Sequence, residues 1–233
     1  MTESGRSVLL TGGTGGLGVA VTRRLLADGW RVVVPWITEK ELERLDAHPR
    51  LVLARADLFD PAGVAEVAAL AGGDEQAPLR AVVNLVGGFA SGARVHESPI
   101  EDFEAMLRLN LRPLYLCTRA ALPFLIDAGG GSVVAMSTKA AFAPFSGASG
   151  YVTSKAAVWA FISALAVEYR DEGIRANAVL PSVIDTPGNR ASQPGSSRKG
   201  WVAPEAIAEV IAFLIGESSA AMTGAQVPVP GVG

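Results

Sequence analysis

Short apolar runs alternate with longer segments of helical periodicity along most of this chain. The apolar runs end at glycine, proline or polar residues, and they occupy residues 7–11, 31–35, 51–54, 80–86, 132–136, 175–180 and 225–229. Helical patterns cover residues 17–27, 39–47, 61–72, 100–128 and 151–171, and Pro204 opens another. Strands that alternate with helices in this way form right-handed β-α-β units. We therefore predict an α/β fold, a doubly wound parallel sheet flanked by helices.

Two stretches depart from this regular alternation. The helical region 100–128 contains Pro113 and Pro123, and proline removes a backbone hydrogen bond, so we expect interruptions there. Residues 187–200 are rich in serine, proline and glycine, which predicts a mobile substrate loop rather than a domain boundary. The length of 233 residues then fits a single domain over residues 1–233.

Composition narrows the class of protein. Hydrophobic residues make up 49% of the chain, which suits a sheet covered on both faces, and a net charge of −3 gives no reason to expect a nucleic-acid partner. A single cysteine and two histidines make a zinc-type metal site unexpected. The first six residues lack a secretory pattern, and no uninterrupted run of about 18 apolar residues suggests a membrane span. We expect a cytoplasmic protein with no membrane partner.

A glycine-rich turn follows the first apolar run. It reads Thr11-Gly-Gly-Thr-Gly-Gly-Leu-Gly18, with glycines at positions 12, 16 and 18 where a side chain would obstruct phosphate or packing. The helix after such a turn directs its partly positive N-terminus at the turn, which favours a pyrophosphate. The turn therefore predicts a dinucleotide-binding, Rossmann-like domain.

The end of the second run bears on the choice between NAD and NADP. An acid about 20 residues after the turn would bind the ribose 2′-hydroxyl, and an arginine would accept a 2′-phosphate. Trp36 stands there instead, with Thr38 and Lys40 nearby, so we predict NADP or NAD with a slight preference for NADP. Glu39 would restore a preference for NAD if its loop folds back.

Asp57, after the third apolar run, has two interpretations. Its carboxylate could accept a hydrogen bond from an adenine amino group, or it could cap the helix that Pro61 opens. Both interpretations stay open at this stage.

Tyr151 and Lys155 carry the candidate chemistry. Residues four apart on a helix share one face, and an ammonium beside a phenol favours the phenolate. We expect the pKa of Tyr151 to fall below its usual value, which would make it a proton donor and acceptor near neutral pH.

Together these motifs resemble the short-chain dehydrogenase/reductase family over nearly the whole chain. Asn84-Leu-Val-Gly87 is similar to its Asn-Asn-Ala-Gly motif, Asn110 to its relay asparagine, and the segment from Pro181 to Thr186 to its nicotinamide-contacting segment. The resemblance implies Tyr151 and Lys155 as the catalytic pair and Asn110 as holder of a proton-relay water. It implies cofactor contacts from Gly12, Thr14, Gly16, Leu17, Gly18, Trp36, Asp57, Leu58, Asn84, Val86, Gly87, Tyr151, Lys155, Pro181, Val183, Ile184 and Thr186.

The position of the family's catalytic serine is altered. That serine usually lies 13 residues before the tyrosine, a position that Thr138 occupies here, whereas Ser137 lies 14 before it. Successive strand residues point to opposite faces, so both hydroxyls should not face one substrate. Spacing favours Thr138, and a local bulge would present Ser137 instead.

A narrower resemblance, to dihydropteridine reductase, lies in residues 87–92, 139–142 and 180–190. It implies that Phe89 lies near the substrate, and we expect Phe142 and Phe145 to line the same pocket. That branch uses NADH through an aspartate at the position of Trp36, so the resemblance leaves the substrate open.

The function predicted from these residues is NAD(P)H-dependent hydride transfer to or from a carbonyl, hydroxyl or quinonoid small molecule. The alternatives are a non-catalytic dinucleotide-binding redox sensor and a methyltransferase with a related glycine turn, which gives no account of the Tyr/Lys pair. The family resemblance also implies a homo-oligomer, a tetramer or dimer packed through the helices around Asn110 and Tyr151.

Overall fold

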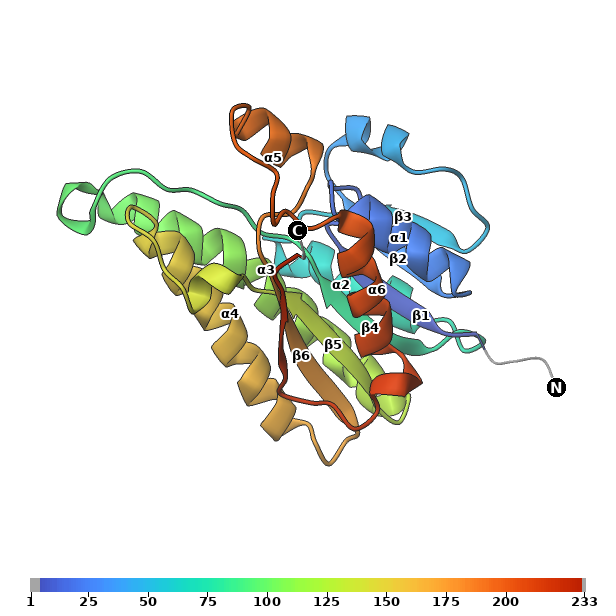
Figure 1. The fold of residues 1–233 in the computed structure, drawn as a ribbon. Coiled ribbons are helices and arrows are strands. Elements are labelled where there is room, and N and C mark those ends of the chain that lie inside the picture. Colours follow the sequence, from blue (N-terminus) through green and yellow to red (C-terminus); the bar gives the residue numbers. More distant parts are fainter. Residues whose placement is uncertain (1–4, 232–233) are drawn as a thin grey trace.

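Seven parallel strands form one sheet at the centre of the molecule (Figure 1). The computed structural model describes residues 5–231. Its strands lie in the order β3-β2-β1-β4-β5-β6-β7, a single α/β Rossmann-like domain as predicted. In chain order they are β1 (Ser7–Thr11), β2 (Arg31–Trp36), β3 (Leu51–Arg55), β4 (Leu79–Asn84), β5 (Gly131–Met136), β6 (Ile174–Pro181) and β7 (Gln226–Val229).

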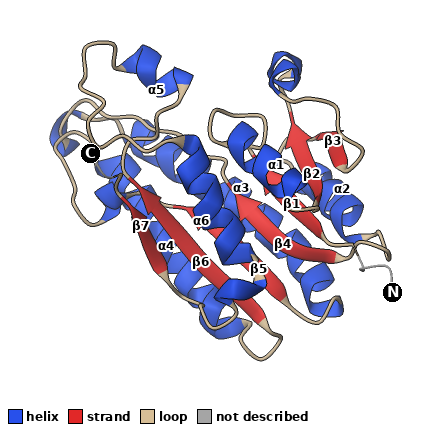
Figure 2. Ribbon diagram, turned by 45° about the vertical axis from the view of Figure 1, so that its right-hand side comes forward, coloured by secondary structure: helices blue, strands red, loops and turns tan. Residues whose placement is uncertain are grey.

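Helices cover both faces of the sheet (Figure 2). Alternate strand residues divide between two cores, because successive side chains point to opposite faces. Val8 and Leu10 of β1 join a core with α1 (Gly18–Ala27) and α6 (Pro204–Ile215). Leu9, between them, joins the core on the other face. That face packs against α2 (Pro61–Gly72), α3 (Ile100–Asp127) and α4 (Ser149–Glu168).

The strand order reverses direction at β1, between β2 and β4. From β1 the chain moves outward to β2 and β3, then returns to place β4 on the other side of β1. Ligands of open α/β sheets bind outside the carboxyl ends of the strands at such a switch point. The glycine turn follows β1, Asn84 ends β4, and Thr138 comes just after β5. The fold therefore collects the predicted site residues along this one edge.

Three local expectations need correction. Helix α3 runs unbroken through Pro113 and Pro123, because its packing against α2 and α4 supports the helix on either side of each proline. Residues 39–47 form the 3-10 helix η1 (Glu39–Arg44) rather than an α-helix. The segment 187–200, expected to be irregular, begins with the short helix α5 (Pro187–Ser192), whose N-cap Thr186 accepts a hydrogen bond from Asn189 N. The mobility of the segment stays a prediction.

Helix α4 is long and apolar enough, by length and composition alone, to cross a membrane. Its Val158, Ile162 and Leu165 instead pack into the core beneath the sheet, as expected for the inner helix of an α/β domain. The absence of a membrane partner and the cytoplasmic location stay predictions.

Candidate active site

The glycine turn after β1 is shaped for close approach of a ligand. Gly12 has a φ of +70°, which side chains rarely adopt, and a Cβ at Gly18 would overlap the carbonyl oxygen of Gly12. Within the described residues, α1 has no acid in its first turn and Leu17 at its N-cap offers no side-chain hydrogen bond. The positive end of the helix is thus not offset by an acid in its own first turn and can attract an anion. The turn fits a dinucleotide pyrophosphate.

An acid reaches the turn from η1. The Thr14 hydroxyl donates to Glu41 Oε2 at 2.7 Å, and Arg44 Nη1 donates to Thr14 O at 3.1 Å and to Glu41 Oε1 at 3.3 Å. Sequence reasoning named Glu39 as the acid that would fold back, and missed Glu41. The glutamates after β2 could have indicated an acid near the turn. The direction of the 3-10 helix η1 decides which of these glutamates faces the turn. Trp36 lies half-buried at the end of β2.

Asp57 lies exposed after β3, and its Oδ1 accepts a hydrogen bond from Phe59 N at 2.9 Å. The interpretation of Asp57 as the cap of α2 is wrong, since Asp60 accepts from the amides of Ala62 and Gly63. The adenine contact of Asp57 stays a prediction. The Leu58 side chain is buried in a small core cluster, which leaves its backbone for any cofactor contact.

Tyr151, Lys155 and Thr138 come together where α4 crosses the end of β5. The Thr138 hydroxyl lies close enough to the Tyr151 phenol to lower its pKa. The ammonium of Lys155 is buried and donates to Met136 O at 3.0 Å. Ser137, on the opposite side of the extended backbone from Thr138, donates to Lys155 O at 2.8 Å and so ties β5 to α4.

The pKa values of Tyr151 and Lys155 differ from those expected from the sequence. Burial raises the pKa of Tyr151, and the nearby Thr138 hydroxyl only partly offsets this. Burial also lowers the pKa of Lys155 from 10.5 to about 8. The expected lowering of the Tyr151 pKa by Lys155 is therefore wrong for the protein by itself, because loss of hydration disfavours both charged forms. The phenol form of Tyr151 suits it to donate a proton at neutral pH.

Asn110 and Lys155 lie beneath the loop that follows β4. Asn110 Oδ1 accepts from Gly88 N at 3.0 Å, and its Nδ2 donates to Gly88 O at 3.2 Å and to Ser154 Oγ at 3.0 Å. A Cβ at Gly87 would lie 2.5 Å from Asn110 Oδ1 and 2.9 Å from Lys155 Nζ. Glycine at position 87 lets the loop rest on these two side chains. The relay water at Asn110 stays a prediction, and the hydrogen bond that Asn110 donates to Ser154 was not foreseen.

The remaining predicted cofactor residues flank this centre. Asn84 is buried and donates to Thr118 Oγ1 at 3.3 Å, and its Oδ1 has no partner among residues 5–231. Val86 packs partly buried against the Leu58 cluster. Pro181 ends β6, and the backbone of Val183 and Ile184 then pairs with Val202. A Cβ at Gly16 would lie 2.9 Å from Thr186 Cβ, so the segment after β6 faces the glycine turn.

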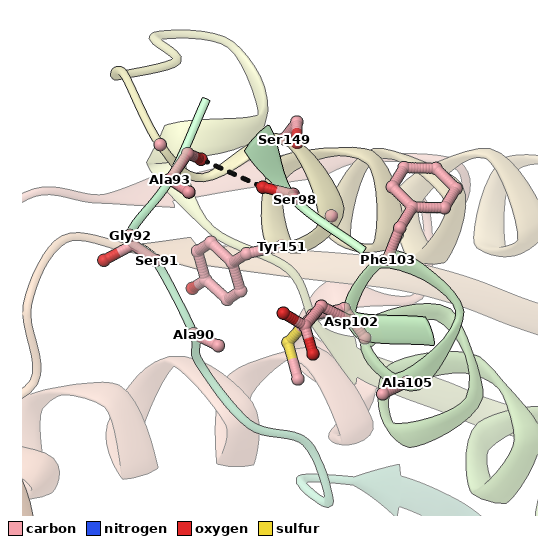
Figure 3. A pocket seen from close by; sticks show the side chains of 13 residues that line it. Ala90, Ser91, Gly92, Ala93, Ser98, Asp102, Phe103, Ala105, Ser149 and Tyr151 are labelled. Carbon is pink, nitrogen blue, oxygen red and sulfur yellow. Dashed lines mark hydrogen bonds between the residues drawn. The ribbon is translucent and has the colours of Figure 1, made fainter. Parts of the chain in front are cut away.

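Two neighbouring cavities share Ala93, Gly147 and Ser149, and Tyr151 lines the first of them. The first, of about 270 Å³, is lined by residues 90–93, by Asp102 and Met106 of α3 and by the Tyr151 ring (Figure 3). The second, of about 340 Å³, is lined by Arg94 and Phe145. The Phe89 ring meets Tyr151 edge-on with centroids 4.9 Å apart and lies 6.3 Å from the Phe145 ring. Phe142 instead packs on Trp159 at 5.2 Å. Asp102 was not foreseen as a lining residue.

No group of three or more histidine, cysteine, aspartate or glutamate side chains within residues 5–231 is placed to hold a metal ion.

Comparison with known proteins identifies the class. Residues 6–196 match the family model described as short chain dehydrogenase. The chain is 32% identical to 2-(R)-hydroxypropyl-CoM dehydrogenase of Xanthobacter autotrophicus, with 97% of each chain covered. It is 29% identical to 2,5-dichloro-2,5-cyclohexadiene-1,4-diol dehydrogenase of Sphingobium indicum, over 98% of this chain and 96% of that protein. The solved structure of levodione reductase superposes with a TM-score of 0.88 at 25% identity, covering 97% of this chain and 96% of that one.

The chain belongs to the short-chain dehydrogenase/reductase family. It is an NAD(P)-dependent oxidoreductase that acts on small molecules, and not a sensor without turnover or a methyltransferase. The relatives named above do not include a dihydropteridine reductase, and that narrower resemblance stays a prediction.

Proposed function

We propose that the enzyme transfers a hydride between the nicotinamide ring and a carbonyl or hydroxyl carbon, with Tyr151 exchanging the proton with the substrate oxygen. The grouping of the Tyr151 phenol, the nearby Thr138 hydroxyl and the buried Lys155 ammonium at the carboxyl edge of the sheet carries the proposal. Tyr151 lines a cavity of about 270 Å³ that a small molecule could enter. When bound, the dinucleotide supplies the reducing equivalents, and the protein supplies orientation and the proton.

Each neighbouring residue has a separate task in this proposal. Lys155, held by Met136 O, binds the nicotinamide ribose and makes the site more favourable to a phenolate when it is protonated. Thr138 hydrogen-bonds the substrate oxygen, a role that its contact with Tyr151 supports. Ser137 is the weaker candidate for bonding the substrate oxygen, because its hydroxyl already donates a hydrogen bond to Lys155 O. Asn110 holds the loop after β4 and positions the relay water.

For the cofactor, the geometry favours NAD over the NADP that the sequence slightly favoured. Glu41 lies 23 residues after Gly18, near the spacing at which an acid binds the ribose 2′-hydroxyl, and its carboxylate is 2.7 Å from Thr14 Oγ1. A 2′-phosphate there would meet this negative charge, which Arg44 offsets only in part. Glu41→Gln should raise affinity for NADPH relative to NADH by about tenfold, measured as dissociation constants, with Glu39→Gln as the matched control. An unchanged ratio in Glu41→Gln would refute the role of Glu41.

For the substrate, Phe89 and Phe145 form the wall nearest Tyr151. Both rings are largely exposed, at 58% and 48%, on loops beside the catalytic hydroxyl. Exposed aromatic side chains at the mouth of a site favour a partly apolar substrate. Phe142 packs on Trp159, so it contacts a substrate that extends in that direction.

The decisive experiment replaces Tyr151 by phenylalanine. Oxidation of NADH and NADPH is followed with a panel of ketones, quinones and dihydropterins, and turnover of any active substrate should fall about 100-fold or more. Tyr115→Phe, at an exposed tyrosine on α3, is the control and should retain activity. Cofactor affinity should stay within a few fold in both variants. Near-normal turnover of Tyr151→Phe would refute the proposal.

A homo-oligomer is also proposed, through the outer surfaces of α3 and α4. Tyr115 and Phe161 contact each other with ring centroids 5.8 Å apart, and they line an open apolar groove with Leu111 and Ala157. Apolar grooves of this kind are typical of subunit interfaces. Light scattering during size-exclusion chromatography should give the mass of a dimer or tetramer, and a monomer would refute this assignment.

A further inference from the structure

A cavity of about 340 Å³ lies at the edge of the sheet opposite the catalytic centre. Its lining comes from the amino ends of the strands: Arg6 precedes β1, Arg80 lies in β4, and Arg175 lies in β6. In Figure 1 this is the lower edge, where β5 and β6 begin, away from α5. Arg170, just after α4, completes a set of four arginines around one space. The proposed function makes no use of them.

Three of the four arginines donate to backbone carbonyls, and Arg80 and Arg175 make the shorter bonds. Arg175 Nη1 donates to Leu214 O at 2.9 Å and to Ser219 O at 3.1 Å, and its Nη2 donates to Gly216 O at 3.2 Å. Arg80 donates to Ala128 O. These bonds fix the direction of each guanidinium but do not remove its charge, because a carbonyl is neutral. Burial lowers the pKa of Arg175, and Glu217 offsets this in part.

The other two arginines are less constrained. The Arg6 guanidinium lies 4.2 Å from the centroid of the Trp30 ring and donates to Asp28 O at 3.4 Å. Arg170 is exposed at the rim of the cavity. Both can turn towards a ligand, since most of their N–H groups are not used by these contacts.

The charge of this cavity is strongly positive. Among the described residues, Glu217 is the one acid that lines it, so the lining has a formal excess of three positive charges in a chain of net charge −3. The C-terminal ends of four helices meet this lining: Arg6 donates to Asp28 O after α1, Arg80 to Ala128 O after α3 and Arg175 to Leu214 O of α6, and Arg170 follows the end of α4. Each helix end contributes about half a negative charge, so together they offset about two of the three positive charges, and about one remains unbalanced.

We propose that this cavity binds a small anion that carries phosphate groups. The planar guanidinium groups match phosphate oxygens in paired hydrogen bonds, and Thr223 adds a hydroxyl to the lining. The volume is at the small end of ligand pockets, which fits a pyrophosphate or a compact phosphate ester rather than a dinucleotide. The position at the amino ends of the strands separates this site from the cofactor.

The test titrates pyrophosphate into the full-length protein by calorimetry, at constant ionic strength and with saturating NADH or NADPH to cover the glycine turn. We expect one saturable site, weakened at least about tenfold in both Arg80→Gln and Arg170→Gln. Arg119→Gln, at an exposed arginine of α3 that does not line the cavity, is the matched control and should bind normally. Activity at the opposite edge should be unchanged in Arg170→Gln, so loss of this site is distinguishable from loss of the enzyme.

Several results would overturn the proposal. Absence of saturable binding would do so, and so would binding that neither arginine variant weakens. Citrate that binds more tightly than pyrophosphate would refute the assignment to phosphate. Arg170 is exposed, so its variant is expected to fold even if Arg80→Gln, which loses the bond to Ala128 O, does not.

Discussion

Lys155 offers a quantitative test, because burial of its ammonium destabilises the folded protein. Its pKa is lowered from 10.5 to about 8 by burial. A shift of this size corresponds to about 3 kcal/mol of unfavourable free energy at pH 7. Lys155→Met removes this cost but also the hydrogen bond to Met136 O, about 1 kcal/mol. The variant should therefore be more stable by about 2 kcal/mol, with turnover lost.

The same reasoning predicts a dependence on pH. Between pH 8 and 10.5 the unfolded chain binds more protons at Lys155 than the folded protein does, so the stability of the wild type rises with pH across this window. From about pH 7 to about pH 9.5 the rise amounts to about 2 kcal/mol. The advantage of Lys155→Met should thus almost vanish at the higher pH. The buried thiol of Cys117 contributes alike to both proteins and cancels in the difference.

The assay is urea unfolding of the cofactor-free proteins at the two pH values and at one protein concentration, followed by tryptophan fluorescence. Lys139→Met, at an exposed lysine just after β5, is the matched control and should differ little from the wild type at either pH. A Lys155→Met protein that is less stable than the wild type at both pH values would refute the reasoning. A difference that stays constant with pH would do the same.

The remaining predictions concern the hydroxyl pair, the turn and the interface. Thr138→Val should lower kcat by about 10- to 100-fold and also cost about 1 kcal/mol on urea unfolding, because its hydroxyl caps the 3-10 helix η3 (Lys139–Ala141) by accepting from Ala140 N. Ser137→Ala should cost about 1 kcal/mol with kcat nearly retained, and the reverse order of kcat values would favour Ser137 as the substrate's partner. Gly18→Ala should abolish NADH binding in calorimetry or prevent folding, because its Cβ would overlap Gly12 O, and normal binding would contradict this account. Phe161→Glu should shift light-scattering masses towards the monomer, and an unchanged mass would place the interface elsewhere.

Some features follow from sequence because they depend on local patterns. All seven strands lie where short apolar runs predicted them, since a parallel strand covered on both faces must be apolar along its length. The glycine turn, Tyr151 and Lys155 were also found locally, because each motif needs particular residue types at fixed spacing. The family assignment rests on these motifs and is confirmed.

Other features required the tertiary structure, because they depend on which residues share an environment. Glu41 meets Thr14 only through the path of η1, and no local pattern distinguishes it from Glu39. The raised pKa of Tyr151 reflects the burial of the assembled site, whereas sequence spacing showed only the nearby ammonium. The four arginines come from segments that lie apart in the chain, so they gather only when the amino ends of the strands align. The sequence determines which chemical groups the protein carries. Packing decides which groups become neighbours and how deeply they are buried, and these two factors set their pKa values.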